Sequence, residues 1–178
     1  MNLSDGRWSG PILDNHFHLD KAGRYLDAAL DFKRAGGTDL VLVHKPDFNN
    51  LPLNEDEIRR AYEETIEMAE NTRSEHDLRV RVVLGPHPAA WMHQTAELGY
   101  EVAGELHISS VEIAIEFCDE NLAVGVGEVV KISAWLARLC DRQCPMLRRK
   151  PFMNAANRPS ATAGFSSTCG FILSHCFT

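Results

Sequence analysis

The sequence predicts an α/β protein in which about four strand–helix units carry parallel strands. Along residues 1–130, short apolar runs alternate with stretches whose apolar residues recur at helical spacing. The connections are short, and the order strand, helix, strand, helix favours right-handed crossovers that place successive strands side by side in a parallel sheet. Residues 131–178 lack this alternation, and we expect them to form an irregular tail.

The first two units open the chain. Residues 11–18 are expected to form a buried strand, and residues 21–35 a helix whose apolar side chains recur near helical spacing until a glycine pair ends it. Residues 40–43, Leu-Val-Leu-Val, then form a run that is apolar on both faces. Such a run is typical of a parallel strand that is covered by helices.

A helix-start signal introduces the next units. Asn54 followed by Glu57 predicts the first turn of a helix, because an asparagine side chain at this position accepts a main-chain N–H of the first turn. The charged residues of this helix are expected to form a solvated face rather than a carboxylate site. The remaining elements are expected at residues 54–69 (helix), 79–84 (strand), 90–98 and 110–120 (helices), and 123–129 (strand).

Composition limits the classes of function. The chain has 178 residues, 44% of them hydrophobic, and a formal charge of −7, so bulk binding to nucleic acid is disfavoured. No apolar stretch reaches the roughly 18 residues of a membrane span and no secretory signal is visible, so a cytoplasmic protein without membrane partners is expected. The five cysteines lack paired zinc-knuckle spacing and are expected to be free thiols.

The charge balance changes after residue 130. Residues 1–130 contain 24 acidic and 11 basic residues, a balance of −13, whereas residues 131–178 contain one acid and seven bases, a balance of +6. Four of the five cysteines also lie in the last 39 residues. Two different compositions are therefore joined at this point.

Each predicted strand is followed by a polar or ionisable side chain. His16 and His18 are two positions apart, so their side chains share one face of the strand and can bind one metal ion. The carboxyl ends of parallel strands meet at one edge of a sheet, where ligands bind in this class of fold. We therefore expect a metal site there. The groups brought to this edge are His16 and His18, His44 and Lys45, His87, and Glu128.

Other polar residues have two interpretations each. Asp14 would orient one histidine by accepting its second ring proton, or it is an ordinary strand-edge carboxylate. Lys45 would hold an anionic substrate group, or it is a solvated lysine. No motif surrounds the three histidines that lie in helical or connecting segments, and these are expected on the surface: His76, His93 and His107.

Three short motifs stand at the predicted strand ends. Residues 14–18 read Asp-Asn-His-Phe-His, residues 85–88 read Gly-Pro-His-Pro, and residues 127–129 read Gly-Glu-Val. In this order they resemble the Asp-x-His-x-His, Gly-x-His-Pro and Gly-Glu-[Ile/Val]-Gly motifs of the TatD-related metal-dependent hydrolases, within the amidohydrolase superfamily. The resemblance covers about residues 10–130, and the loops look closest to an archaeal branch.

The resemblance implies a partial (β/α)8 TIM barrel of about four units whose mouth holds one or two divalent metal ions. By this resemblance, His16, His18 and Glu128 would be metal ligands, and His87 would lie near the metal or the substrate. Imidazole and carboxylate ligands suit zinc best, with manganese or magnesium as alternatives. An ion with an open position would generate hydroxide for attack on an ester, amide or phosphodiester bond.

The family pattern stops after residue 129. Val130 stands where the family has glycine, and no later strand ends in the two histidines or the aspartate that complete the family's site. Four units use about 120 residues, whereas a whole barrel takes about 250. We therefore expect residues 131–178 to be an aberrant tail, either frameshifted or disordered. A half-barrel would expose its edges to self-association, and without a positioned base its turnover would be impaired.

Three functions are compatible with these observations. The first is a metal-dependent hydrolase of the TatD-related type, with a deoxyribonuclease-like activity as one example in that family and a small molecule or a phosphodiester as substrate. The second is a non-catalytic fragment, or a metal-binding half-barrel that pairs with a second copy. The third is an unrelated small α/β binding module whose histidines are incidental.

Overall fold

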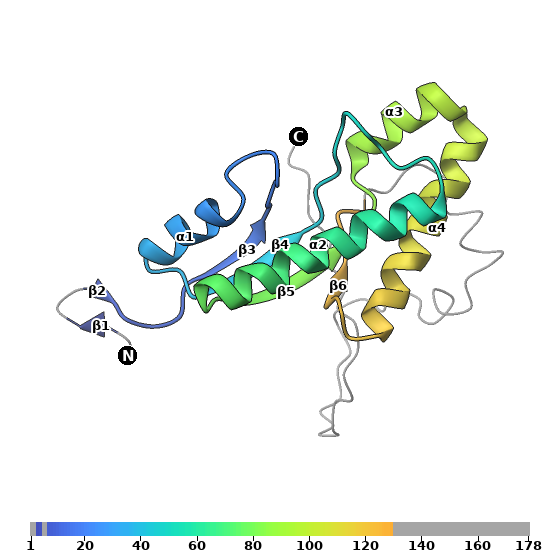
Figure 1. The fold of residues 1–178 in the computed structure, drawn as a ribbon. Coiled ribbons are helices and arrows are strands. Elements are labelled where there is room, and N and C mark those ends of the chain that lie inside the picture. The colour runs from blue at the N-terminus through green and yellow to red at the C-terminus, as the bar shows by residue number, and fades with distance from the viewer. Residues whose placement is uncertain (1–2, 5–6, 130–178) are drawn as a thin grey trace, which may run out of the picture. The chain divides into compact units, whose positions relative to one another are not determined.

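A computed structural model describes residues 3–4 and 7–129 of the chain. These residues contain a short antiparallel strand pair, a parallel sheet and the helices that cover the sheet (Figure 1). The predicted tail lies outside the described residues. In chain order, the elements are β1 (Leu3–Ser4), β2 (Arg7–Trp8), β3 (Leu13–Phe17), α1 (Leu26–Arg34), β4 (Asp39–Val43), α2 (Glu55–His76), β5 (Arg79–Leu84), α3 (Pro88–Leu98), α4 (Tyr100–Asp119) and β6 (Gly125–Val126).

The parallel sheet has the strand order β3-β4-β5-β6 in the described part of the chain. The strands β4 and β5 pair in register over five residue pairs, and β6 pairs with the last two residues of β5. The register between β3 and β4 shifts between Asp14 and Phe17, which marks a β-bulge. The predicted α/β class with parallel strands is confirmed, and β3 and β6 are the outer strands of the sheet.

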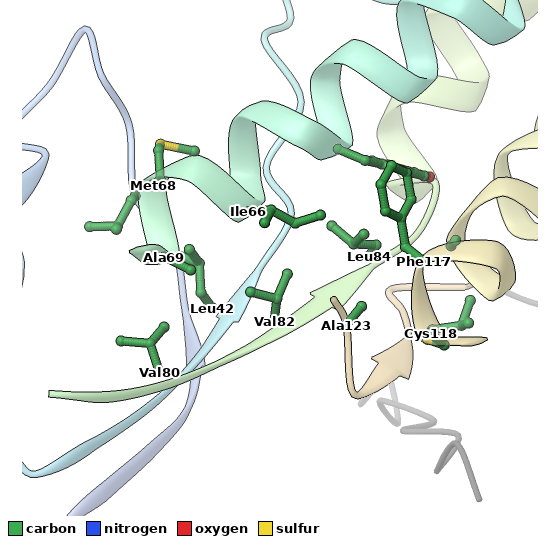
Figure 2. Packing of buried hydrophobic residues seen from close by; sticks show 14 of the residues in the cluster. Leu42, Ile66, Met68, Ala69, Val80, Val82, Leu84, Phe117, Cys118 and Ala123 are labelled. Carbon is green, nitrogen blue, oxygen red and sulfur yellow. The ribbon is translucent and has the colours of Figure 1, made fainter. Parts of the chain in front are cut away.

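Hydrophobic side chains fill both sides of the sheet, because successive strand residues point to opposite faces. On the helix-covered side, Leu42, Val82 and Leu84 face Ile66 and Ala69 of α2 (Figure 2). Each of these leucine, valine and isoleucine side chains contributes roughly 1.5–3 kcal/mol when it is fully buried. A smaller cluster on the other side consists of Val41, Val43 and Val83.

The start of α2 confirms the predicted cap. The Oδ1 atom of Asn54 accepts a hydrogen bond from the main-chain N–H of Glu57 at 3.0 Å. The helix continues past the predicted end at residue 69, because Thr72 is still fully buried against the rest of the protein. It ends at His76, where Asp77 takes a left-handed conformation with φ of 50°.

Other elements also differ from their predicted lengths. The helix α1 begins at Leu26, five residues after its predicted start, because residues 21–25 form a turn. The helix α4 begins at Tyr100, ten residues before the predicted start, because Ala103 and Leu106 extend its buried side. The strand β6 is shorter than predicted, with only Gly125–Val126 in the sheet. None of the described helices is both long and apolar enough to cross a membrane.

The amino end of the sheet is closed by polar contacts within the chain. The guanidinium of Arg79 donates to both carboxylate oxygens of Asp39, at 2.6 and 2.7 Å. The hydroxyl of Thr38 donates to the same carboxylate at 2.6 Å and accepts the N–H of Ile12 at 2.9 Å. The contact with Arg79, followed by that with Thr38, lowers the pKa of Asp39 to about 2.

Candidate metal centre

Three side chains meet at the carboxyl ends of the two outer strands. His16 lies in β3, His18 follows β3, and Glu128 follows β6. The Nε2 atom of His16 is 2.8 Å from Oε1 of Glu128 and 3.0 Å from Nε2 of His18. All three candidate ligand atoms lie within 4.8 Å of one another. The structure therefore brings together the three residues that the sequence motifs selected as metal ligands.

The ring of His18 is fixed by a main-chain contact. Its Nδ1 atom is 2.9 Å from the carbonyl oxygen of Val43, the last residue of β4. A carbonyl only accepts hydrogen bonds, so Nδ1 carries the proton and the neutral ring has a lone pair on Nε2. That lone pair lies on the nitrogen nearest His16. Metal-binding histidines have this arrangement, with one nitrogen donating to a carbonyl and the other free to bind the ion.

The imidazole of His16 lies between two acceptors. Its Nε2 atom is hydrogen-bonded to Nε2 of His18, which carries a lone pair, so the proton of this contact is on His16. The same atom lies 2.8 Å from the carboxylate of Glu128. A cation in place of this proton would meet the same three atoms. Tetrahedral zinc, with bonds of 2.0–2.1 Å, separates its ligand atoms by about 3.3 Å. Two of the observed separations, 2.8 and 3.0 Å, need a small expansion to fit such an ion. The third, between His18 and Glu128, is at most 4.8 Å, and binding would bring these two side chains to the same spacing.

The cluster is open to solvent on one side. The side chains of His16 and Glu128 are 40% and 20% exposed. An ion held there would keep a coordination position for water or substrate, as catalytic zinc sites do.

Of the two interpretations of Asp14, the structure favours the strand-edge carboxylate. Its Oδ1 atom accepts the main-chain N–H of His16 at 3.0 Å, whereas the other interpretation gave it a histidine ring proton. The β-bulge between Asp14 and Phe17 explains the difference, because it interrupts the regular alternation of side chains on which that prediction depended. The carboxylate of Asp14 therefore supports the main chain of the bulge.

Gly85 allows β6 to bring Glu128 to the cluster. The Gly127 N–H donates to the Leu84 carbonyl at 2.9 Å, which ties the chain before Glu128 to the end of β5. A Cβ atom on Gly85 would lie only 2.6 Å from the carbonyl oxygen of Gly127. A glycine is therefore needed at this close approach of two main chains.

His87 lies behind the carboxylate of Glu128. Its Nε2 atom is 3.3 Å from Oε2, the carboxylate oxygen that is not paired with His16. Partial burial lowers the pKa of His87, although the charge of Glu128 acts in the opposite direction. The ring of Phe48 packs edge-on against the imidazole, with ring centres 5.5 Å apart.

His44 and Lys45 follow β4 at the same edge but have partners of their own. His44 is buried, its Nδ1 atom is 2.8 Å from the Thr65 hydroxyl, and burial lowers its pKa to about 4. Lys45 forms an ion pair with Asp20. Both residues line a hollow of about 630 Å³ beside α2. The three candidate ligands do not line it, so the hollow neighbours the cluster and does not contain it.

Some features of the site have no signal in the sequence. The Val43 carbonyl acts through its main chain, and the position of Phe48 depends on the fold of its loop.

The expectation of a surface position is wrong for His107, which is only 1% exposed. It lies on the buried side of α4, and its ring packs edge-on against Trp91.

Comparison of the chain with protein-family models, with curated proteins and with solved structures finds no match in any of the three.

Proposed function

We propose that this chain is a metal-dependent hydrolase of the TatD-related type, in which His16, His18 and Glu128 hold a divalent ion. The observation that carries this proposal is the convergence of two imidazole nitrogens and a carboxylate oxygen within 4.8 Å. The orientation of His18 by a main-chain carbonyl supports it, because incidental surface histidines have no need of a fixed tautomer.

The proposal includes the fold of the family, with the described residues as the first four units of a (β/α)8 barrel. Neighbouring strands lie about 4.8 Å apart, so β3 and β6 would be separated by about 14 Å in a flat sheet. Contact between His16 and Glu128, at the ends of these strands, favours a sheet that curves as a barrel wall does.

Each residue has a defined task in this proposal. His18 presents a lone pair fixed by Val43, and Glu128 supplies a negative charge. His16 would hold the ion in the tautomer that carries its proton on Nδ1, which leaves the lone pair on Nε2. Two imidazoles with one carboxylate suit zinc, or manganese, better than magnesium, which prefers oxygen ligands. When bound, such an ion acidifies a water molecule and polarises the bond to be hydrolysed, whether ester, amide or phosphodiester.

We propose slow turnover for the chain as it stands. The later histidines and the aspartate that complete the family's set have no counterparts in their expected places in the sequence. A positioned general base contributes roughly 10²–10⁴-fold to the rate of such reactions. Metal binding without efficient hydrolysis is therefore the expected behaviour.

A second candidate is a metal-binding half-barrel that associates with a second copy. The outer strands β3 and β6 each pair on one side only within the described residues. Apolar side chains are exposed close to both, namely Leu13 at 52% and Val124 at 45%. Unpaired strand edges with exposed apolar residues favour pairing with another chain.

A zinc titration with hydrolysis assays tests the proposal. We expect the protein to bind one zinc ion, measured by competition with a chromophoric chelator, and His18→Ala and Glu128→Ala to lose most of that affinity. His93→Ala, which removes an exposed imidazole from α3, is the control and should bind zinc normally. Slow, zinc-dependent hydrolysis of bis-p-nitrophenyl phosphate or p-nitrophenyl acetate, lost in Glu128→Ala, would support the hydrolase. Zinc binding with no hydrolysis would favour the half-barrel. Equal zinc affinity in all four proteins would contradict both.

A further inference from the structure

We infer that His87 is the positioning residue for the Glu128 carboxylate, and that the first turn of α3 sets the tautomer in which it acts. The inference rests on the metal site proposed above and adds a residue that supports it. It follows from the two different partners of the two ring nitrogens.

The Nδ1 atom of His87 caps α3. It accepts the main-chain N–H of Ala89 at 3.1 Å, and His87 is the N-cap residue of the helix. Pro88 has no N–H, so Ala89 provides the first free donor of this helix. Because an N–H can only donate, Nδ1 must carry the lone pair. The proton of the neutral ring is therefore on Nε2.

The protonated Nε2 atom faces Glu128. It lies 3.3 Å from Oε2, while Oε1 of the same carboxylate is 2.8 Å from Nε2 of His16. The N–H end of the ring is therefore the end in polar contact with the negatively charged carboxylate. The two carboxylate oxygens thus have different neighbours: Oε1 lies at the proposed metal site, and Oε2 lies next to His87. Because its Nε2 has no free lone pair, His87 is not itself a ligand in this tautomer.

The surroundings of His87 restrict the ring further. Phe48 packs against it edge-on at 5.5 Å between ring centres, and the side chain is 26% exposed. Its position also follows from the fold, because His87 comes three residues after β5, the strand that pairs with β6. A ring held at both nitrogens and along one edge can fix the orientation of a carboxylate that would otherwise rotate.

Two variants separate the contacts of the two nitrogens. In His87→Asn, the side-chain oxygen takes the place of Nδ1 and still caps α3, but nothing reaches Glu128. In His87→Gln, the terminal amide takes the place of Nε2 and still donates to Glu128, but the cap is lost.

The variants should have opposite effects. We expect His87→Asn to unfold at the wild-type temperature without metal and to lose about 10–100-fold in zinc affinity, as is typical when the partner of a metal ligand is removed. His87→Gln should keep most of the zinc affinity and unfold at a temperature a few degrees lower, because of the lost cap. Chelator competition and thermal unfolding measure the two properties.

Three results would overturn the assignment of His87. The first is wild-type zinc affinity in His87→Asn. The second is a loss of affinity in both variants that follows their loss of stability. The third is an Nδ1–H tautomer in ¹⁵N NMR spectra of the metal-free protein, which needs no bound ion to detect. Failure of the wild-type protein to bind zinc would instead overturn the proposed metal site.

Discussion

The two ends of the parallel sheet use their polar residues in different ways. At the amino end, Asp39 and Arg79 form a two-point ion pair, so each charge is neutralised within the chain. At the carboxyl end, two imidazole nitrogens and one carboxylate oxygen lie within 4.8 Å of one another, and the side chains of His16 and Glu128 are partly exposed. The charges of the amino end are paired with each other, whereas those of the carboxyl end form the group that we propose to hold a cation.

The two ends of the sheet should therefore influence different properties of the protein, namely its stability and its binding of metal. Ligand sites in parallel α/β proteins lie at the carboxyl ends of the strands, and the opposite end mainly supports the fold. Substitutions at the amino end should therefore change the free energy of unfolding and leave zinc affinity unchanged. Substitutions at the carboxyl end should change zinc affinity.

Gly85→Ala should have the largest effect, because it changes both properties. The added Cβ would lie 2.6 Å from the Gly127 carbonyl oxygen, so β6 must move away from β5 and take Glu128 with it. We expect the free energy of unfolding to fall by about 1–3 kcal/mol, as for other overpacked sites, and zinc affinity to fall as well. Urea unfolding and chelator competition measure both. The control is Gly23→Ala, whose Cβ would make only ordinary contacts, the nearest at 3.5 Å. Normal zinc binding by Gly85→Ala would contradict this account of the carboxyl end.

His107→Leu tests how a buried histidine that belongs to neither end of the sheet makes the free energy of unfolding depend on pH. Both ring nitrogens of His107 lack hydrogen-bond partners among the described residues, and burial lowers its pKa to about 4. As the pH falls, the imidazole of the unfolded chain is protonated near pH 6.5, whereas the buried imidazole of the folded chain stays neutral down to about pH 4. The folded state is therefore most favoured above pH 6.5, and this contribution to the free energy of unfolding is lost as the pH falls to 4. The loss is on the order of 3 kcal/mol. His107→Leu should weaken this pH dependence in urea unfolding and bind zinc normally at pH 7. An unchanged pH profile would show that His107 is not the group responsible.

Asp39→Asn tests the amino end. The low pKa of Asp39, about 2 against an ordinary 3.8, means that its ion pair stabilises the fold above pH 3.8 and is lost as the pH falls to 2. The variant should be less stable than wild type at pH 7 in urea unfolding and should lose this acid-sensitive step, with unchanged zinc affinity. Asp119→Asn, at an exposed position of α4, is the control. A weaker zinc site in Asp39→Asn would mean that the two ends of the sheet are coupled.

Lys45→Met should have the smallest effect. The ion pair between Lys45 and Asp20 is 40% and 45% exposed, and such pairs contribute no more than about 1 kcal/mol. We expect stability and zinc affinity close to wild type. A selective loss of phosphodiester hydrolysis relative to ester hydrolysis would show that Lys45 leaves Asp20 to bind an anionic substrate.

The central elements of the fold could be predicted from the sequence, and several boundaries could not. Residues 40–43 are continuously apolar and mark β4, residues 79–84 are rich in valine and mark β5, and Asn54 marks the start of α2. The first turns of α4 were not predicted, because Gly104 weakens the helical pattern there. In the structure, Ala103 is fully buried, so packing outweighs that low propensity.

The members of the candidate site could be selected from the sequence, but their orientations could not. Motif spacing selects His16, His18 and Glu128, which lie together in the structure. Their hydrogen bonds depend on tertiary contacts, such as that between His18 and the Val43 carbonyl. The bulge that redirects Asp14 likewise depends on pairing between strands.

Anomalous diffraction at the zinc edge, from crystals grown with zinc, tests the central claim most directly. We predict a single strong peak about 2.0–2.1 Å from Nε2 of His16, Nε2 of His18 and one carboxylate oxygen of Glu128. A peak at other residues, or a carboxylate of Glu128 turned away from both imidazoles, would contradict the proposed metal site.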